Sequence, residues 1–444
     1  MRFLYLIVKI FANYSLRIYF PRILKINAPK NRFGRTIYVS NHPSSFMDPI
    51  VIGTLQRPIV FFMTRSDIFT PVMKPILWMV QMLPIYRQLD GEGAVGKNAA
   101  VFKTTSNVLS FGRNLLIFGE GFTDDIFIRR LKPIKKGAAR IGFSALESMK
   151  WKKKVYVSCI GINYGDPKYL GSDLVINNSE RFCLNDYESM YRENPNRAIT
   201  EVTRRIESMM KPLITHVENK EWAPFHEQIT RIRRNGLNPE DVDLSISLRK
   251  RYKNSQNLAQ WINEQDLENP ALVALKNQSD TYFRLQKRLG LKEKYVYELQ
   301  KNGSLSNTNH WIYLILTAPI FVLATLHLGP MYVLVKRLTE KMFKRSVFWS
   351  SVKMMLGMLL MALFNWPIVK FLNDYLFHNG WIALVYFFTI PLFGVAAYYY
   401  KRHFIALKTK QKLQSMDLKE FVAKRKELEE KIEELVKGSL CIKI

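Results

Sequence analysis

A histidine and an aspartate separated by five residues form the pair with the clearest chemical potential, in the segment SNHPSSFMDP at residues 40–49. A carboxylate about one turn after a histidine can hold one imidazole nitrogen, which leaves the other nitrogen free to take a proton from a hydroxyl. The preceding residues, 36–39, are β-branched or aromatic and predict a short strand. We therefore expect His42 at a strand end, with Asp48 nearby, either as a general base or within a polar turn that caps a helix.

A glycine-rich turn follows a second apolar run, at residues 115–118. Its sequence is Gly119-Glu120-Gly121, with Thr123 two positions further on. Glycine lets the backbone approach a ligand closely, and Glu120 can accept hydrogen bonds from a polyol or orient an arginine. The alternative interpretation is a glycine-rich turn that carries a surface glutamate.

Basic residues near these turns are candidate phosphate ligands. Arg87 follows the apolar stretch that ends at residue 85, and a planar guanidinium can hold a phosphate through two parallel hydrogen bonds. Lys135 lies in a basic run just before a predicted helix that starts at Gly137, and a helix start favours anions. A solvated arginine and a solvated basic face are the alternatives.

Taken in order, these segments resemble the boxes of the glycerolipid acyltransferase superfamily, which includes glycerol-3-phosphate and 1-acylglycerol-3-phosphate acyltransferases. His42 and Asp48 resemble its His/Asp box, although most members have four residues between the two. The longer spacing followed by Pro49 is similar to the branch of fungal-type glycerol-3-phosphate/dihydroxyacetone-phosphate acyltransferases and their bacterial relatives. Residues 61–87 resemble the second region, in which an arginine holds the substrate phosphate.

The later boxes follow the same order. Residues 118–121 resemble the Phe-Pro-Glu-Gly box, with Gly119 in the position of proline. Residues 133–139 resemble its Pro-Leu-Lys-x-Gly-x-Ala continuation, and residues 155–164 resemble the fourth region, which we expect to form a pocket wall.

The resemblance implies an O-acyltransferase that uses an acyl thioester, acyl-CoA or acyl-carrier protein, as co-substrate and needs no cofactor or metal. His42 is then the catalytic base and Asp48 orients it. The implied acceptor-binding residues are Arg87, Gly119, Glu120, Gly121, Thr123 and Lys135. Backbone amides near Ser44 or Gly121 are candidates to stabilise the oxyanion. A lysophosphatidate or lysophospholipid acyltransferase, a transacylase and an inactive membrane scaffold with this fold are the alternatives.

The pattern of apolar runs predicts an α/β fold in which a central mixed sheet is flanked by helices. The expected strands are 36–39, 59–63, 115–118 and 155–162, with 174–178 as a last edge strand. The expected helices are 49–55, 71–82, 92–110 and 137–148. Loops at the strand ends of such a sheet meet at one edge, where active sites lie.

Composition places the chain at a membrane. The 444 residues carry a net charge of +29 and are 48% hydrophobic. Long apolar runs and the lack of nucleic-acid-binding motifs disfavour nucleic acid as a partner, whereas an anionic phospholipid surface fits both the charge and the apolar runs. Three cysteines without paired spacing indicate a reducing compartment, and the scattered histidines do not suggest a metal site.

Five regions are expected along the chain. Residues 1–29 predict an amphipathic helix at the membrane interface, 30–190 the α/β acyltransferase domain and 191–308 a helical cap or spacer. Residues 309–402 predict a membrane region, and 403–444 a charged helix that packs against the cap or mediates a homo-oligomer.

The membrane region contains three apolar runs, 311–335, 347–372 and 381–400. The positions of lysine and arginine predict that the second and third runs form a hairpin with cytoplasmic ends. The first run, broken by Pro319 and Pro330, is then expected to be re-entrant or interfacial, with three full spans as the alternative. We expect an integral membrane protein whose active site faces the cytoplasm, in a bacterial inner membrane.

Overall fold

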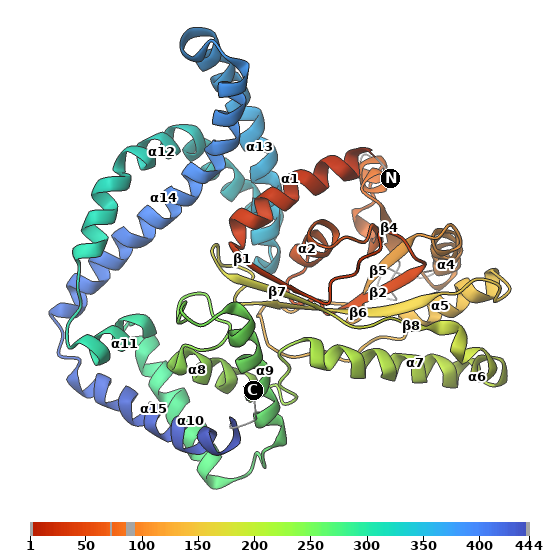
Figure 1. Ribbon diagram of the computed structural model, residues 1–444, viewed down its shortest axis with the longest axis horizontal. Helices are drawn as coiled ribbons and strands as arrows, with labels where there is room; N and C mark the ends of the chain where they lie inside the picture. Colours follow the sequence, from red (N-terminus) through yellow and green to blue (C-terminus); the bar gives the residue numbers. More distant parts are fainter. Residues whose placement is uncertain (1–2, 72, 86–93, 441–444) are drawn as a thin grey trace. The chain divides into compact units, whose positions relative to one another are not determined.

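A mixed sheet of eight strands forms the centre of the N-terminal part of the protein (Figure 1). The computed structural model describes residues 3–71, 73–85 and 94–440. The strands are β1 (Arg22–Ile26), β2 (Thr36–Ser40), β3 (Val60–Arg65), β4 (Met82–Ile85), β5 (Asn114–Phe118), β6 (Tyr156–Tyr164), β7 (Asp173–Asn178) and β8 (Phe182–Cys183). Their order is β1-β7-β6-β2-β5-β3-β4, with β8 paired to β6. The predicted α/β fold class is confirmed.

The inner strands bring two loops to one edge of the sheet. β2 pairs in parallel with both β5 and β6, and β3 pairs in parallel with both β5 and β4. At the ends of β2 and β5, Ser40 lies opposite Phe118. The loop that carries His42 and the Gly-Glu-Gly turn therefore start side by side, at the edge where parallel sheets place their active sites.

The edge of the sheet that contains β1 and β7 differs from the prediction. The expected edge strand β7 is an inner strand, because β1 pairs with it on the outside. The N-terminal helix α1 (Phe3–Tyr19) is correspondingly shorter than the helix expected over residues 1–29. β1 carries basic residues that hide its strand pattern, but both find partners: Arg22 pairs with the buried Asp173 and Lys25 donates to the Leu55 carbonyl.

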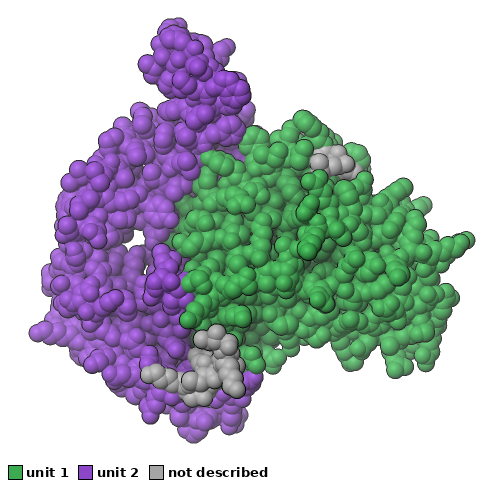
Figure 2. Space-filling model, viewed as in Figure 1, with its two compact units in different colours: residues 1–223, 247–263 green, residues 224–246, 264–444 purple. Residues whose placement is uncertain are grey.

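The other helices up to residue 264 are α2 (Met47–Leu55), α3 (Met73–Met79), α4 (Ala94–Ser110), α5 (Gly137–Ser148), α6 (Glu188–Glu193), α7 (Pro195–Met210), α8 (Ala223–Arg233) and α9 (Leu248–Glu264). The chain divides into two compact units, coloured in Figure 2: residues 1–223 with 247–263, and residues 224–246 with 264–444. The stretch 191–308, expected as one cap, is therefore shared between the two units.

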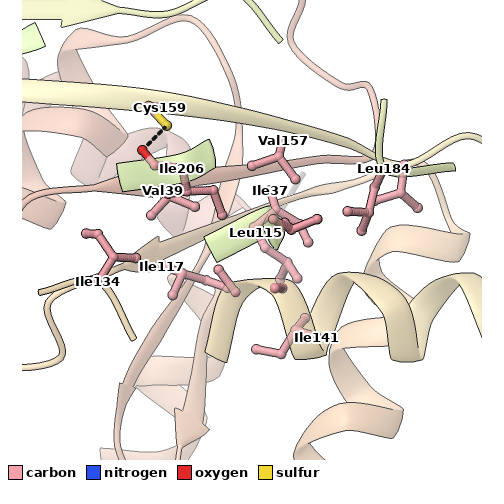
Figure 3. Packing of buried hydrophobic residues seen from close by; sticks show 14 of the residues in the cluster. Ile37, Val39, Leu115, Ile117, Ile134, Ile141, Val157, Cys159, Leu184 and Ile206 are labelled. Atoms are coloured by element: carbon pink, nitrogen blue, oxygen red, sulfur yellow. Dashed lines mark hydrogen bonds between the residues drawn. The ribbon is translucent and has the colours of Figure 1, made fainter. Parts of the chain in front are cut away.

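One face of the sheet is buried beneath α4, α5 and α7. Successive strand residues point to opposite faces, so Ile37 and Val39 of β2 share this face with Val157 and Cys159 of β6 (Figure 3). The Cys159 thiol lies 3.6 Å from the carbonyl oxygen of Ile206 in α7. Helix α7 thus completes the core of the α/β unit.

The second unit contains α10 (Pro270–Arg288), α11 (Glu293–Asn302), α12 (Thr308–Met342), α13 (Trp349–Leu372), α14 (Gly380–Gln414) and α15 (Lys419–Leu440). α12, the helical segment 346–377 that contains α13, and α14 are each long and apolar enough to cross a membrane. α15 packs against α10 and α11 of its own chain. The apolar stripe that suggested a second chain, which includes Phe421, Leu428 and Ile432, is buried within this one.

Candidate active site

His42 and Asp48 lie in direct contact at the end of β2. The His42 Nδ1 atom is 2.9 Å from Asp48 Oδ2, and Asp48 is fully buried whereas the histidine side chain keeps 17% of its surface exposed. The imidazole stacks on the Phe118 ring with 4.1 Å between centroids. Across the described residues, no side chain or backbone group is hydrogen-bonded to Nε2. The ring is therefore held through one nitrogen and presents the other.

The five-residue spacing is accommodated by a tight turn between the two residues. Ser45 adopts a left-handed conformation, with φ of 48°, and the amides of Met47 and Asp48 donate to the carbonyls of Ser44 and Ser45. The Ser44 amide donates to Asp48 Oδ2 over 2.8 Å. The same carboxylate oxygen thus holds both the turn and the imidazole, so the additional residue does not separate His42 from Asp48.

Tyr164, at the end of β6, fixes the other carboxylate oxygen. Its hydroxyl donates to Asp48 Oδ1 over 2.8 Å and is completely buried. Burial, together with the charge of Asp48, raises the pKa of Tyr164 well above its usual value, so this hydroxyl keeps its proton and remains a donor. The sequence interpretation treated this strand as a pocket wall and missed this contact, since a strand pattern does not reveal which hydroxyl meets a distant carboxylate.

Glu120 joins the two loops of the site. One carboxylate oxygen accepts the backbone amide of His42 at 3.0 Å, and the other accepts the amide of Lys132 at 3.2 Å. Burial raises the pKa of Glu120, while the Lys132 charge and these two amides oppose that shift. Glu120 is almost fully buried, so it sets the position of His42 through the backbone instead of facing solvent.

The glycines beside Glu120 are required for different reasons. A Cβ at Gly119 would lie 2.9 Å from side-chain atoms of both Ile134 and Val39, which leaves no room for a larger residue. Gly121 has φ of +75°, a conformation that other residues rarely adopt. Its amide donates to the Phe118 carbonyl, and the Ser44 amide donates to Asp48, so an oxyanion donor near these positions would be a neighbouring amide.

A cleft lies next to His42. Its lining includes Asn41, Pro43 and Glu120, together with Arg129, Arg130 and Lys132. Asn41 is fixed there, because its side chain exchanges two hydrogen bonds with the backbone of Ile162. The cleft thus combines the neighbours of His42 with three basic residues.

The basic side chains near the cleft differ in their hydrogen-bond and ion-pair partners. Arg129 donates to the carbonyls of Tyr164 and Gly165 and is a structural support. Lys132 Nζ is 3.2 Å from Asp124 and 3.7 Å from Glu120, so its charge is already compensated. Arg130 Nε is buried, and within the described part of the chain no group accepts a hydrogen bond from it. Arg130 is therefore the cation best placed to bind an anion.

The remaining predicted residues include one that the structure does not describe and two that it does. Arg87 is outside the described residues. Lys135 is exposed and is not part of the cleft lining, although its backbone amide donates to the Gly119 carbonyl. Thr123 is buried beneath the loop. Arg130 belongs to a run of basic residues, and their sequence alone does not indicate which of them faces a cleft.

Comparisons with known proteins agree with the resemblance of the sequence. Residues 24–163 match the model of the Acyltransferase family, a region that begins in β1 and ends in β6. No curated protein matches the chain. Among solved structures, the 1-acyl-sn-glycerophosphate (LPA) acyltransferase PlsC from Thermotoga maritima is similar at 14% identity, over 46% of this chain and 79% of that chain, with a TM-score of 0.30.

The role of Glu120 can be tested by Glu120→Gln. Glutamine has one acceptor oxygen, so one of the two buried amides loses its partner, which typically costs about 1–3 kcal/mol. We expect a thermal midpoint lower by several degrees in the purified protein. Asp124→Asn is the control, because the Asp124 carboxylate is 44% exposed and its pair with Lys132 is worth less than about 1 kcal/mol. Equal midpoints for wild type and Glu120→Gln would contradict the assigned role.

Proposed function

We propose that this protein is a membrane-bound O-acyltransferase. It transfers a fatty acyl group from an acyl thioester to a hydroxyl of glycerol-3-phosphate, or of a closely related acceptor, in phospholipid synthesis. The observation that carries the proposal is the Asp48–His42 pair, with Nε2 unoccupied, beside a cleft that contains an unpaired guanidinium nitrogen. The match of residues 24–163 to the Acyltransferase family supports it.

The reaction uses the imidazole twice. Nε2 of His42 takes the proton of the acceptor hydroxyl while the hydroxyl oxygen bonds to the thioester carbonyl carbon. Asp48, bound to Nδ1, stabilises the imidazolium that forms. The tetrahedral intermediate then collapses, the carbon–sulfur bond breaks, and the thiolate leaving group takes the proton from His42. The products are an ester and a free thiol, of coenzyme A or of acyl-carrier protein.

Arg130 binds the phosphate of the acceptor in this proposal. Its guanidinium is always charged and can bind phosphate through two hydrogen bonds. Lys132 already faces two carboxylates, and Lys135 lies outside the cleft lining. In this proposal a phosphate at Arg130 shares the cleft with Asn41 and Pro43, which flank His42, and the glycerol hydroxyl reaches the imidazole. Holding both reactants in this way supplies several kcal/mol of the barrier reduction.

The proposed acceptor class rests on the resemblance of the His-to-Asp spacing to one branch of the superfamily. Five intervening residues followed by Pro49 favour the branch related to fungal-type glycerol-3-phosphate/dihydroxyacetone-phosphate acyltransferases and their bacterial relatives. The primary acceptor is then a small phosphorylated three-carbon compound.

The protein works at a phospholipid membrane. Besides the three long apolar helices, α1 exposes Phe3 and Ile10, and α3 exposes Ile76 and Trp78. Exposed apolar side chains on two helices of the α/β unit fit insertion into the membrane interface. The basic segments that flank the apolar helices support a cytoplasmic active site, and the proposal includes a bacterial inner membrane as its location.

Replacement of His42 tests the proposed reaction. Membranes that contain wild type, His42→Ala or Asp48→Asn receive radiolabelled acyl-CoA and glycerol-3-phosphate. We expect ester formation by wild type and a loss of roughly 10²–10⁴-fold for His42→Ala, the usual contribution of a general base. Parallel reactions with dihydroxyacetone phosphate and lysophosphatidate rank the acceptors. A wild-type protein without activity on any of these acceptors, with acyl-CoA or acyl-carrier protein as donor, would identify a scaffold.

Arg130→Ala tests the phosphate site. Loss of a charged hydrogen bond of about 1.5–3 kcal/mol predicts an acceptor KM that is roughly 10–100-fold higher, with the KM for the acyl donor unchanged. Arg140→Ala, which removes an exposed arginine on α5, is the control and leaves both constants unchanged. An unchanged acceptor KM in Arg130→Ala would show that the phosphate binds elsewhere.

A further inference from the structure

We infer that α12 enters the membrane and returns to the same face, as an arch whose apex is held by a polar cluster of His327, Asn365 and Tyr386. The chain then crosses the membrane only twice, through α13 and α14. This inference concerns the second unit alone and does not depend on the proposed reaction.

The helices on either side of the membrane region fold against each other. α11 ends shortly before α12, and α15 begins shortly after α14. Arg425 of α15 and Glu293 of α11 are both fully buried, and Arg425 Nε is 2.6 Å from the Glu293 carboxylate. Arg425 also donates to the Gln300 side chain over 2.7 Å. A buried ion pair of this kind forms only when both helices lie on the same side of the membrane.

This pairing limits the number of crossings. A chain that leaves one face and returns to it crosses an even number of times, whereas three apolar helices are long enough to cross. One of the three must therefore not cross. Our expectation from the sequence was that the first apolar run is re-entrant, and the contacts of α12 now supply an independent reason.

The two ends of α12 both lie beside the open end of the hairpin that α13 and α14 form. Near its start, the Tyr313 ring stacks on His403, close to the end of the apolar part of α14, with 4.0 Å between centroids. Near its end, Glu340 pairs with Lys353 in the first turns of α13 at 2.9 Å. The start of α13 and the end of α14 are the two open ends of the hairpin, so both ends of α12 lie beside the open end.

The middle of α12 lies deeper. His327 Nδ1 is 2.7 Å from Asn365 of α13, and Nε2 is 2.8 Å from the hydroxyl of Tyr386 of α14. Asn365 lies twelve residues beyond Lys353, or about 18 Å further along α13 at 1.5 Å per residue. That distance is close to half the thickness of a bilayer core of about 30 Å. α12 therefore reaches roughly mid-depth and then returns.

Proline explains how one helix can make this path. α12 contains Pro319 and Pro330, and each removes a helical hydrogen bond and bends the helix. Figure 1 shows α12 bent along its length, with its later part leading into the start of α13. Gly329 and Pro330 directly follow the contacts of His327 and mark the turning point.

The polar cluster at the apex is internally satisfied. The Asn365 amide nitrogen donates to the carbonyls of His327 and Met361, so its Oδ1 faces the imidazole as an acceptor. Nδ1 of His327 is therefore the donor in this contact, and Nε2 contacts the Tyr386 hydroxyl. Both His327 and Asn365 are buried. In an apolar surrounding such a closed cluster joins helices that otherwise present only apolar faces to one another.

The positions of lysine and arginine also support a first apolar helix that does not cross the membrane. Lys336, Arg337, Lys341, Lys344 and Arg345 lie at the end of α12 and just after it, and Lys401 and Arg402 lie beyond the apolar part of α14. The hairpin tip, residues 373–379, carries neither lysine nor arginine. Apart from Lys370, which lies near the tip at the end of α13, these basic residues are thus on one face, as in cytoplasmic segments of membrane proteins.

Cysteine labelling tests the topology in the full chain. Cys159, Cys183 and Cys441 are replaced with alanine, and single cysteines are introduced as Ser304→Cys, Lys344→Cys, Ser415→Cys or Asp374→Cys. A membrane-impermeant maleimide is added to sealed vesicles of either orientation. We expect the first three variants to react from one face and Asp374→Cys to react only from the other. Reaction of Lys344→Cys and Ser304→Cys from opposite faces would overturn the inference, as would reaction of all four from one face.

The apex cluster is tested by a double-mutant cycle. His327→Leu and Asn365→Leu remove the same set of contacts, so the double variant should have a thermal midpoint close to that of the less stable single variant. Thr325→Val, which changes an exposed position of α12, should combine additively with Asn365→Leu. Additive effects of His327→Leu and Asn365→Leu would show that the two residues do not form a unit and would overturn the assigned apex.

Discussion

The site depends on the hydrogen bonds of one buried carboxylate. Asp48 has no exposed surface, and it meets three donors: the His42 ring and the Ser44 amide from the preceding loop, and the Tyr164 hydroxyl from β6. A buried charge is tolerated only when such partners compensate for the loss of water. The same contacts that make Asp48 compatible with burial therefore hold the imidazole at the edge of the sheet in a defined orientation.

The parallel strands and Glu120 connect the loop that carries His42 to the loop that lines the cleft. β2 and β5 end side by side, and Glu120 binds the backbone of both the His42 loop and the Lys132 segment. Behind it, His216 Nδ1 accepts the amide of Leu131. Burial lowers the pKa of His216 to about 4, which keeps the ring neutral and able to accept this hydrogen bond at neutral pH. The loop that carries Arg130 is thus held in relation to the loop that carries His42.

Much of the α/β unit could be predicted because short runs of consecutive residues indicate its strands and turns. The runs before His42 and Glu120 are apolar and β-branched, and each ends in a glycine- or proline-containing turn, so these strands are readable from the chain, although their order in the sheet is not. β1 was missed because Arg22 and Lys25 mask its pattern, and only the contacts with Asp173 and Leu55 explain how those charges are accommodated. Tyr164 and Arg130 were missed because their roles depend on contacts between distant segments.

The sequence predicts that Pro319 and Pro330 break the first apolar run, whereas α12 continues through both as one helix. The contacts of α11 with α15 and of α12 with the hairpin could not be inferred from the apolar runs, because hydropathy gives the length of a segment and not its neighbours.

The most direct test of the central claim is a structure of the full chain in a lipid nanodisc with glycerol-3-phosphate bound. The account predicts the phosphate against Arg130 and a glycerol hydroxyl oxygen within about 3.2 Å of His42 Nε2, the distance needed for proton transfer. It also predicts that the hydrogen bond between His42 Nδ1 and Asp48 is retained. A phosphate bound away from the cleft, or an imidazole turned so that Nε2 faces no hydroxyl, would contradict it.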